Sequence, residues 1–536
     1  MFRVPAWFRV DPLHANRTLN RFISGPALVW YLAASKLMLH LATASRYGIF
    51  RDEMYYWAGS LRMDWGYVDH PPLTVWLAWI VRNVFGNSPL SVRLLPALAG
   101  AALVWLTGKL TREMGGGRFA QGVAALAVVV VPAYLILHHW LTDNAWEPLI
   151  WMGCVWFIVR IIHSGDGSNW IWFGVLAGIG FENKYSIAFL LFGLLLGMVL
   201  TAHGHFLKCR YLWFGVMVCA VIALPNFLWQ MMHHFPFLEL IRNVRMGNRD
   251  VVRGPVTFIA DQVAILNPAL SPLWVGGVIW LFVGQHDGDT NVQGRGSRRY
   301  RMLAWTFFVV LTTFIVLKAK NYYVVPIYPM LFAAGAIGLE RITAGYRIGN
   351  WSRAIYVGLV IAAGIVLLPF SVPVLSPENY LLYQKALDIR PPEIEHQRNG
   401  SLPQWYADEF GWPEMVEKVA RVYNSLPPEE RAHTAIFSNG WGEAAAVDFY
   451  GPRFGLPLAI SKHNSYWIWG PRNYSGSTVI ILRSGGRDEP GLFESVESVG
   501  HVEHPYARRD EYFDILLCRG FKRNLKDVWP ALKQFN

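Results

Sequence analysis

Long apolar runs are the feature that most limits what this chain can fold into. Between Phe22 and Phe370, stretches of about 15 to 22 apolar residues follow one another with short polar breaks. A run of about 20 such residues can cross the hydrocarbon core of a bilayer as a helix. The 536 residues are 53% hydrophobic and only 16% charged, below the roughly one quarter that is usual in soluble proteins. The sequence therefore predicts a polytopic α-helical membrane protein.

The composition changes after Ser371. Charged residues and prolines become frequent, and the apolar stretches shorten to strand length. Three segments favour β-strands and a fourth favours a helix: 433–439, 478–484 and 512–518, and 413–426. We therefore expect a transmembrane domain over residues 1–372 and a water-soluble α/β domain, the tail, over residues 373–536.

Charge decides which of the apolar runs cross the membrane. The candidate runs are 22–42, 71–85, 91–110, 118–138, 145–162, 170–183, 185–203, 211–230, 272–285, 301–317, 322–340 and 353–372. Basic residues cluster in five segments that the positive-inside rule places in the cytoplasm: 3–21, 109–118, 203–210, 295–301 and 341–353. All five share one side only if run 71–85, which contains Arg82, lies in the outer interface. This predicts eleven spans, a first outer loop over 43–90 and an outer tail.

Net charge and cysteine content exclude other classes of protein. The net charge of +11 is spread over short clusters between apolar runs, which is typical of membrane orientation and does not indicate nucleic-acid binding. Of the four cysteines only Cys518 lies in the tail, so neither an internal disulfide framework nor a cysteine-rich zinc site is expected there. Run 22–42 is longer than the roughly 7 to 15 residues of a signal-peptide core, and we interpret it as a retained anchor.

The first outer loop carries an acid pair directly after the first run. Residues 51–73 read RDEMYYWAGSLRMDWGYVDHPPL, and MYYWAGSL favours a short helix. In one interpretation Asp52 caps this helix and Glu53 interacts with its positive end. In the other, Asp52 is a general base that takes a proton from a hydroxyl held within about 3 Å. The two interpretations are compatible, because a cap also fixes the position of the carboxylate.

Further polar residues lie at the predicted outer ends of the spans. Asp69 and His70 precede two prolines, and either hydrogen-bond a substrate or the loop, or ligate a metal. Tyr55 is another candidate substrate contact. Asp143 either caps the next helix or joins the site, and Glu147 lies one turn inside a span, where an acid is costly without a partner.

Candidate phosphate-binding cations lie at the same predicted face as these acids. Lys184 stands with Glu182 between two apolar runs, so it either pairs with that acid or binds a phosphate. Lys320 and Arg245 are further candidate phosphate ligands. Such residues suit a hydroxyl activated by a carboxylate and a phosphate held by cations at the membrane surface. A sugar carried on a lipid phosphate meets this description, because the phosphate leaves readily once its charge is offset.

Six segments carry a family resemblance: 51–73, 91–121, 143–151, 180–186, 223–230 and 320–331. With them the chain resembles the bacterial members of glycosyltransferase family 39, the protein O-mannosyltransferase-like group. That group is related to the transferase that adds aminoarabinose to lipid A, and it shares the fold called GT-C. The segments cover most of residues 47–335 in the expected order.

The resemblance implies an activity and a set of roles. It implies inverting transfer of one hexose or pentose from a polyprenyl-phosphate carrier to a lipid, glycan or protein hydroxyl, at the extracytoplasmic face of the bacterial inner membrane. The family's catalytic Asp falls on Asp52 with Glu53 beside it, its second outer acid on Asp143, and its phosphate-binding Lys on Lys184. The aminoarabinose enzyme has Glu-Lys where this chain has Asp69-His70. The resemblance therefore does not imply, for this chain, the phosphate contact of that Lys or any metal contact of that Glu. No cofactor is implied with certainty, and a divalent metal is left open.

The rival hypothesis is a transporter or flippase of lipid-linked sugars. Such a protein needs polar residues through the bilayer midplane and on both faces. Here they crowd on the predicted outer face. The sequence therefore predicts a membrane glycosyltransferase whose partners are a polyprenyl-phosphate sugar, an acceptor and the lipid bilayer, with no nucleic acid.

Overall fold

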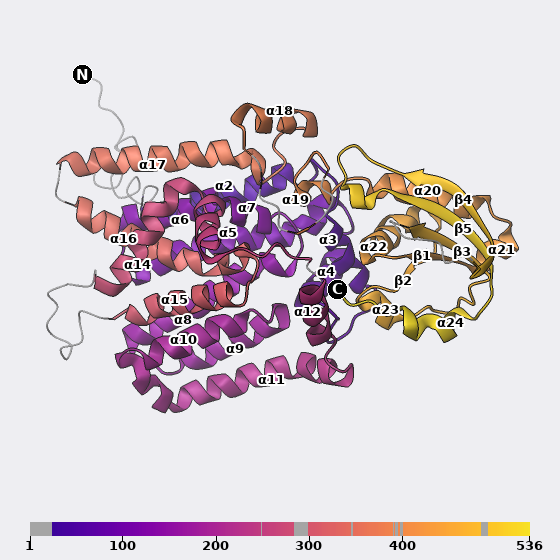
Figure 1. Cartoon of the computed structure of the whole chain (residues 1–536). Helices are drawn as coiled ribbons and strands as arrows, with labels where there is room; N and C mark the ends of the chain where they lie inside the picture. The colour runs from indigo at the N-terminus through magenta and orange to yellow at the C-terminus, as the bar shows by residue number, and fades with distance from the viewer. Residues whose placement is uncertain are drawn as a thin grey trace, which may run out of the picture.

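A computed structural model describes residues 24–247, 249–283, 299–344, 347–389, 391, 395–396, 400–483 and 491–536. The basic segments predicted to be cytoplasmic at 3–21 and 295–298 lie outside the described residues. Figure 1 shows a bundle of helices, the helical part, beside a smaller unit built on a β-sheet.

Every apolar run of the sequence coincides with a helix or with two consecutive helices. The helical part contains α2 Gly25–Thr43, α3 Arg51–Gly59, α4 Leu73–Val84, α5 Pro89–Glu113, α6 Arg118–Val130, α7 Pro132–Leu137, α8 Glu147–Ser164, α9 Asn169–Asn183, α10 Ile187–Val199, α11 Arg210–Met232, α12 Pro236–Met246, α13 Pro255–Ile265, α14 Ser271–Val283, α15 Arg301–Val316, α16 Tyr328–Thr343 and α17 Arg347–Leu367. The short helix predicted after the acid pair is α3. Helices α12 and α13 lie between the predicted runs 211–230 and 272–285, where the sequence contains no candidate span.

Within the described residues, five helices are long and apolar enough to cross a membrane by length and composition: Pro89–Glu113, Asp143–Ser164, Arg210–Met232, Asn321–Thr343 and Gly349–Phe370. The number rises to seven if two sharply bent helix pairs each count as one span. Helix α4, in the run that we expected to lie in the interface, is one of the shorter apolar helices.

Glycines bring some of these helices into backbone contact. A Cβ atom on Gly277 of α14 would lie 2.1 Å from the carbonyl oxygen of Leu331 in α16. A Cβ on Gly335 of α16 would lie 1.9 Å from the carbonyl oxygen of Leu273. Only a residue without a side chain permits this approach, which is common between membrane helices.

The tail forms a five-stranded sheet in the order β2-β1-β3-β5-β4. Its strands are β1 Thr434–Ser438, β2 Ile460–Ser461, β3 Thr478–Arg483, β4 Phe493–Val502 and β5 Phe513–Phe521. Strands β1, β2 and β3 are parallel, and β5 is antiparallel to both β3 and β4. The three predicted strands correspond to β1, β3 and β5, and the predicted helix to α20, Trp412–Ser425. The remaining helices are α18 Pro377–Leu387, α19 Gln404–Ala407, α21 Pro428–His433, α22 Trp441–Tyr450, α23 Ser465–Trp469 and α24 Leu525–Val528.

The core of the tail includes α3, which comes from the segment between α2 and α4. One face of the sheet packs on α20 and α22, and Met54, Tyr55 and Ala58 of α3 are buried in the same apolar cluster. Figure 1 shows α3 beside α22, where the helical part meets the sheet unit. The helix that carries Asp52 is therefore held between the two parts of the molecule.

Candidate active site

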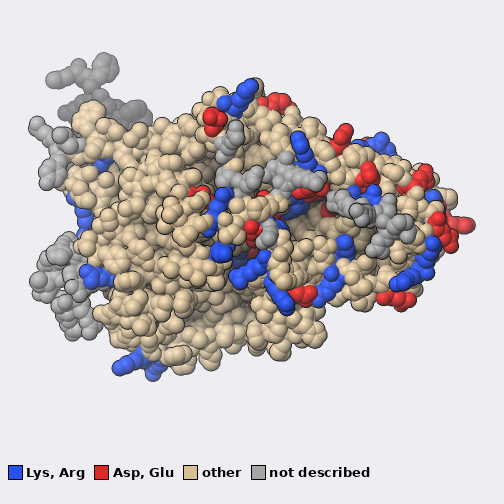
Figure 2. Space-filling model, in the orientation of Figure 1, with Lys and Arg blue, Asp and Glu red and all other residues tan. Residues whose placement is uncertain are grey.

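Charged side chains gather where the helical part meets the tail. In the view of Figure 2 the helical part is mostly uncharged, whereas Lys, Arg, Asp and Glu crowd over the junction and the tail. The elements that supply the junction are α3, the segments before α8 and α10, the start of η6 (Asn321–Ile327) and the tail.

Asp52 presents an accessible carboxylate in this region. It is the second residue of α3, whose N-cap is Phe50, so the helix-cap interpretation of Asp52 is wrong. Its side chain is 38% exposed, and the ion pair given for it is with Arg51 Nε at 3.8 Å. Burial among surrounding protein atoms raises the pKa of Asp52 to about 7; Arg51 opposes this, and nearby acids, including Asp408 and Asp143, add to it. Asp52 can thus accept a proton near neutral pH.

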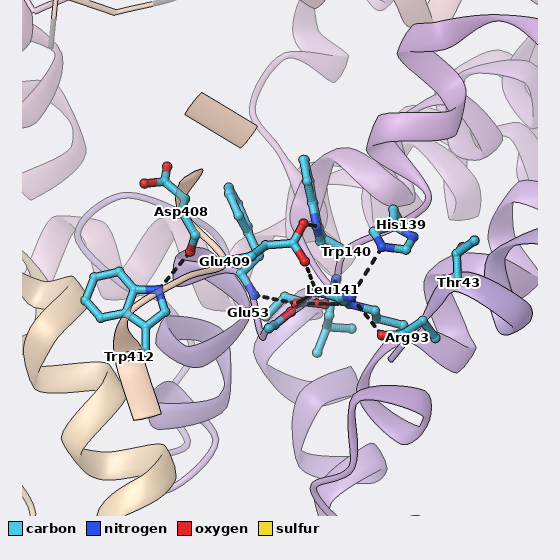
Figure 3. Close-up of polar contacts among 12 residues, drawn as sticks. Thr43, Glu53, Arg93, His139, Trp140, Leu141, Asp408, Glu409 and Trp412 are labelled. Atoms are coloured by element: carbon cyan, nitrogen blue, oxygen red, sulfur yellow. Dashed lines mark hydrogen bonds and ion pairs between the residues drawn. The ribbon is translucent and has the colours of Figure 1, made fainter. Parts of the chain in front are cut away.

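Glu53 has the opposite environment, although it is the next residue. Its side chain is fully buried and pairs with Arg93 of α5 at 3.0 Å. Its carboxylate also accepts hydrogen bonds from the backbone N–H groups of Phe50 (2.9 Å) and Leu141 (3.1 Å). Figure 3 shows this network, in which Glu53 connects α3 to Arg93 of α5 and to the backbone at Leu141. These contacts occupy both oxygens of Glu53.

Two residues of this network were not predicted. Arg93 is 1% exposed, and Glu409 of the tail accepts a hydrogen bond from its Nη2 at 3.0 Å. Glu409 Oε1 also accepts a hydrogen bond from Trp140 Nε1 at 3.2 Å. Arg93 could have been noticed as a charge inside an apolar run. No local pattern marks Glu409.

Lys184 joins the two predicted acids of the α8 region. Its Nζ lies 3.8 Å from Asp143 Oδ2 and 3.4 Å from Glu147 Oε2, and it donates a hydrogen bond to Asn144. Burial lowers the pKa of Lys184, but the two carboxylates outweigh this and raise it above its ordinary value. The alternative pair with Glu182 is not formed, and neither carboxylate oxygen of Glu182 has a hydrogen-bond partner. The cap interpretation of Asp143 is also wrong, because the N-cap of α8 is Trp146.

Lys320 forms a second cationic position at the junction. Its Nζ donates to Glu395 Oε1 at 2.6 Å and lies 3.2 Å from Asp250 Oδ1. Although burial raises the pKa of Glu395, Lys320 and Arg249 lower it to about 2, so this acid is ionised. Arg245 is exposed near the end of α12 and is not among these ion pairs.

Electrostatic contacts join these positions into one site. Asp143 acts on Asp52 and pairs with Lys184, and Glu395 acts on Asp52 and pairs with Lys320. Burial raises the pKa of the Tyr56 phenol, and Asp143 and Asp52 raise it further. The phenol therefore lies near both acids, and Asp52 lies in the same part of the junction as the acids that pair with Lys184 and Lys320.

Asp69, His70 and Tyr55 connect the first loop to the tail. Asp69 accepts hydrogen bonds from the Tyr55 hydroxyl (3.0 Å) and from Asn464 Nδ2 of the tail (3.2 Å). The Tyr55 hydroxyl also accepts from Ser465 N at 3.2 Å. His70 is buried, and its Nδ1 donates to the Pro71 carbonyl at 3.0 Å. Over the described ranges, no group of three or more His, Cys, Asp or Glu is placed to hold a metal ion.

Comparisons with known proteins agree with this architecture. Residues 69–229 match the model of a family described as dolichyl-phosphate-mannose-protein mannosyltransferase. The lipid A galacturonosyltransferase RgtD of Rhizobium johnstonii is 23% identical over 279 residues, which cover 51% of this chain and 56% of that protein. The match thus spans about half the length of this curated relative.

Solved structures match nearly the whole chain. ArnT from Cupriavidus metallidurans bound to undecaprenyl phosphate superposes with a TM-score of 0.59 at 15% identity, covering 91% of this chain and 97% of ArnT. The apo form of ArnT gives a TM-score of 0.60 at 14% identity with the same coverage. The predicted resemblance is therefore confirmed: the chain has the GT-C fold of ArnT and resembles the protein O-mannosyltransferase-like glycosyltransferases.

Proposed function

We propose that this protein is an inverting membrane glycosyltransferase that moves one hexose or pentose from a polyprenyl-phosphate carrier to a hydroxyl of a lipid acceptor. The observation that carries the proposal is the shared site, in which the accessible Asp52 carboxylate lies with the cations Lys184 and Lys320. A base and phosphate-binding cations are the groups that this reaction needs.

The reaction is a single displacement at the anomeric carbon. The Asp52 carboxylate takes the proton of the acceptor hydroxyl, and the oxygen attacks the sugar from the face opposite the phosphate. The bond between the anomeric carbon and the phosphate oxygen breaks, and polyprenyl phosphate leaves with the bonding electron pair. Lys184 and Lys320 offset the charge of this phosphate, so that the leaving oxygen needs no proton. Asp143, Glu147 and the brace formed by Asp69, His70 and Tyr55 shape the site around the substrates.

An apolar groove suits part of the carrier chain. It has a volume of about 230 Å³, and Gln262 of its lining donates a hydrogen bond to the carbonyl of Asn321, the residue after Lys320, at 2.9 Å. Its lining is almost wholly apolar and includes Ile259, Trp274, Ile279, Phe307, Leu311 and Tyr328. A polyprenyl chain can lie in such a groove with its phosphate toward Lys320.

The proposed topology has eleven spans, with residues 1–372 in the membrane and residues 373–536 outside. The site and the tail then face the extracytoplasmic side of the bacterial inner membrane. This placement rests on the positive-inside rule applied to the basic loops. Exposed Arg245, on α12, would lie near the headgroups on this side, where it can attract an anionic substrate.

The relatives support the substrate classes. One solved ArnT structure contains undecaprenyl phosphate, which supports a lipid-phosphate donor. The name of RgtD gives lipid A as the molecule that receives its sugar, which supports a lipid acceptor.

Product formation by the purified protein tests the proposal. Wild-type protein in lipid nanodiscs is mixed with polyprenyl-phosphate sugars and a lipid A extract, and both lipids are analysed by mass spectrometry. We expect loss of the sugar-loaded carrier and an acceptor that is heavier by one sugar. A transporter or flippase would leave both lipids chemically unchanged, and that result would overturn the proposal.

A further inference from the structure

Arg93 connects several segments of the chain at the start of α3. Its Nη1 donates to the carbonyl of Ala44 (2.8 Å) and to His139 Nε2 (3.2 Å), and its Nη2 donates to the carbonyl of Gly48 (2.7 Å). Its Nε and Nη2 bind Glu53. The rigid fork of a guanidinium therefore has an acceptor for each of its N–H groups and fixes the geometry of the chain around it.

Glu409 brings the tail into the same network. Its carboxylate is fully buried between Arg93 and Trp140. The Trp140 ring stacks on Phe50, the N-cap residue of α3, with ring centroids 4.2 Å apart. Glu409 thus reaches the residue that starts the helix of Asp52, through an aromatic contact as well as an ion pair.

The backbone of the same tail segment touches the chain just before Asp52. The carbonyl of Asp408 accepts a hydrogen bond from Arg51 N at 3.1 Å. The carbonyl of Glu409 approaches Gly48 so closely that a Cβ there would lie 2.0 Å away. The tail therefore contacts the chain that enters α3 directly at Gly48 and Arg51, and reaches Phe50 through Trp140.

Charge balance alone does not require Glu409. Glu53 already neutralises Arg93. Burying a second carboxylate, that of Glu409, against the same guanidinium costs desolvation free energy that charge neutralisation does not offset. Burial raises the pKa of Glu409 to about 7, although Arg93 opposes this.

We propose that Glu409 is a positioning residue for Asp52, acting through Arg93 and Trp140. Glu409 of the tail holds the first turn of α3 in place. Asp52 therefore takes the position needed for proton transfer only when the tail packs against the helical part. Because Glu53 also holds Leu141 N, the same network aligns the segment that leads to Asp143. This inference rests on the proposed function, in which Asp52 is the base.

The variant Glu409→Gln tests the inference in purified full-length protein. Gln keeps one acceptor oxygen but cannot accept from both Arg93 and Trp140. A small displacement of a catalytic group can cost on the order of 100-fold, so we expect kcat to fall about 10- to 100-fold. The KM for the lipid donor should change less than about twofold, because the cations are not in this network. The acid limb of the pH profile should move to lower pH as Asp52 becomes better solvated.

A matched control breaks a different buried contact across the same junction. Asp448 of the tail pairs with Arg62, which lies beyond the other end of α3, at 3.1 Å. Asp448→Asn should lower the unfolding temperature while kcat and the acid limb stay at their wild-type values. Equal effects of the two variants on kcat and on the acid limb would show that any weakening of the contact between the tail and the helical part has this effect. That result would overturn the inference.

Two further variants, Trp140→Phe and Asp52→Asn, distinguish failure of the positioning role of Glu409 from failure of the proposed base. A wild-type kcat and acid limb in Glu409→Gln would overturn the positioning role. If Glu409→Gln does not fold, Trp140→Phe removes the hydrogen bond to Glu409 and reduces the ring that stacks on Phe50. It should change kcat and the acid limb in the same direction, and wild-type behaviour would then overturn the positioning role. An active Asp52→Asn protein would contradict the proposed base itself, whereas an inactive one with a wild-type Glu409→Gln would contradict only the role of Glu409.

Discussion

Asp52 and Glu53 are adjacent acids with different tasks. Successive residues of a helix point about 100° apart, so one carboxylate faces the junction while the other faces Arg93. The sequence named Asp52 as the base with Glu53 beside it as a further catalytic candidate, and it could not predict that Glu53 is buried against Arg93. This difference between the two acids depends on Arg93, which is 40 residues away, and on Glu409, which is 316 residues from Arg93.

The raised pKa of Asp52 predicts the pH dependence of transfer. A general base acts in its deprotonated form, and the pKa of Asp52 is about 7. We expect kcat/KM to rise about tenfold per pH unit below pH 7 and to level off above it. Initial rates between about pH 5 and 9 measure this.

The assignment of this limb needs two controls, because burial also raises the pKa of Glu443 and of Glu409 to about 7. The variant Glu409→Gln should move the limb and not abolish it. The variant Glu443→Gln should keep the acid limb at its wild-type position. A flat wild-type profile, or a limb that disappears with Glu443, would contradict the assignment to Asp52.

Lys184 is predicted to act on donor binding. Removing a charge-assisted contact to a phosphate costs about 1.5–3 kcal/mol, which is roughly 10- to 150-fold. Lys184→Ala should therefore raise the KM for the lipid-phosphate donor by at least about tenfold. The matched variant Arg242→Ala removes an exposed cation of α12 and should leave this KM unchanged. Equal KM values in all three proteins would remove Lys184 from the phosphate site.

At the scale of elements, apolar length was sufficient for the long helices of the helical part, whereas α12, α13 and most helices of the tail were not predicted. Each apolar run became helix, and strands β1, β3 and β5 were predicted from apolar β-rich segments. Strand β4 was missed because most of its residues are exposed, so its sequence lacks an apolar signal. Strand β2 was missed for a different reason: its two residues are buried, but a segment of two residues is too short to give a strand signal.

Two neighbouring glycines of α14 test the packing of the helices. A Cβ at Gly277 would lie 2.1 Å from the Leu331 carbonyl, whereas a Cβ at Gly276 would meet nothing within 4 Å. Gly277→Ala should destabilise the protein by about 1–3 kcal/mol through overpacking. Gly276→Ala should be neutral or stabilise it by about 0.5–1 kcal/mol, because Ala favours the helix. Thermal unfolding in detergent compares them, and equal unfolding temperatures would contradict the close approach of α14 and α16.

At the scale of the whole molecule, the site exists only where two parts meet. Helix α3 is buried in the core of the tail, and the ion pairs of Arg93 and Lys320 each include an acid from residues beyond 372. From the sequence we predict that the acids and cations lie on one face of the membrane. The sequence could not predict which tail residues complete the site, because those contacts join residues far apart in the chain.

The proposed topology predicts which positions are accessible from outside. In a background without native cysteines, Lys526→Cys in the tail should react with a membrane-impermeant maleimide in intact spheroplasts. Gly115→Cys, between α5 and α6, should react only after the membrane is opened. Labelling of both from outside, or of Gly115→Cys alone, would contradict the orientation.

The most direct test of the account measures donor binding and sugar transfer on the same Asp52→Asn preparation. If Asp52 is the base and the cations hold the phosphate, the variant should bind the lipid-phosphate donor with wild-type affinity. Its transfer rate should fall by about 10²- to 10⁴-fold, the usual contribution of a general base. A folded variant that transfers sugar at the wild-type rate would contradict the account.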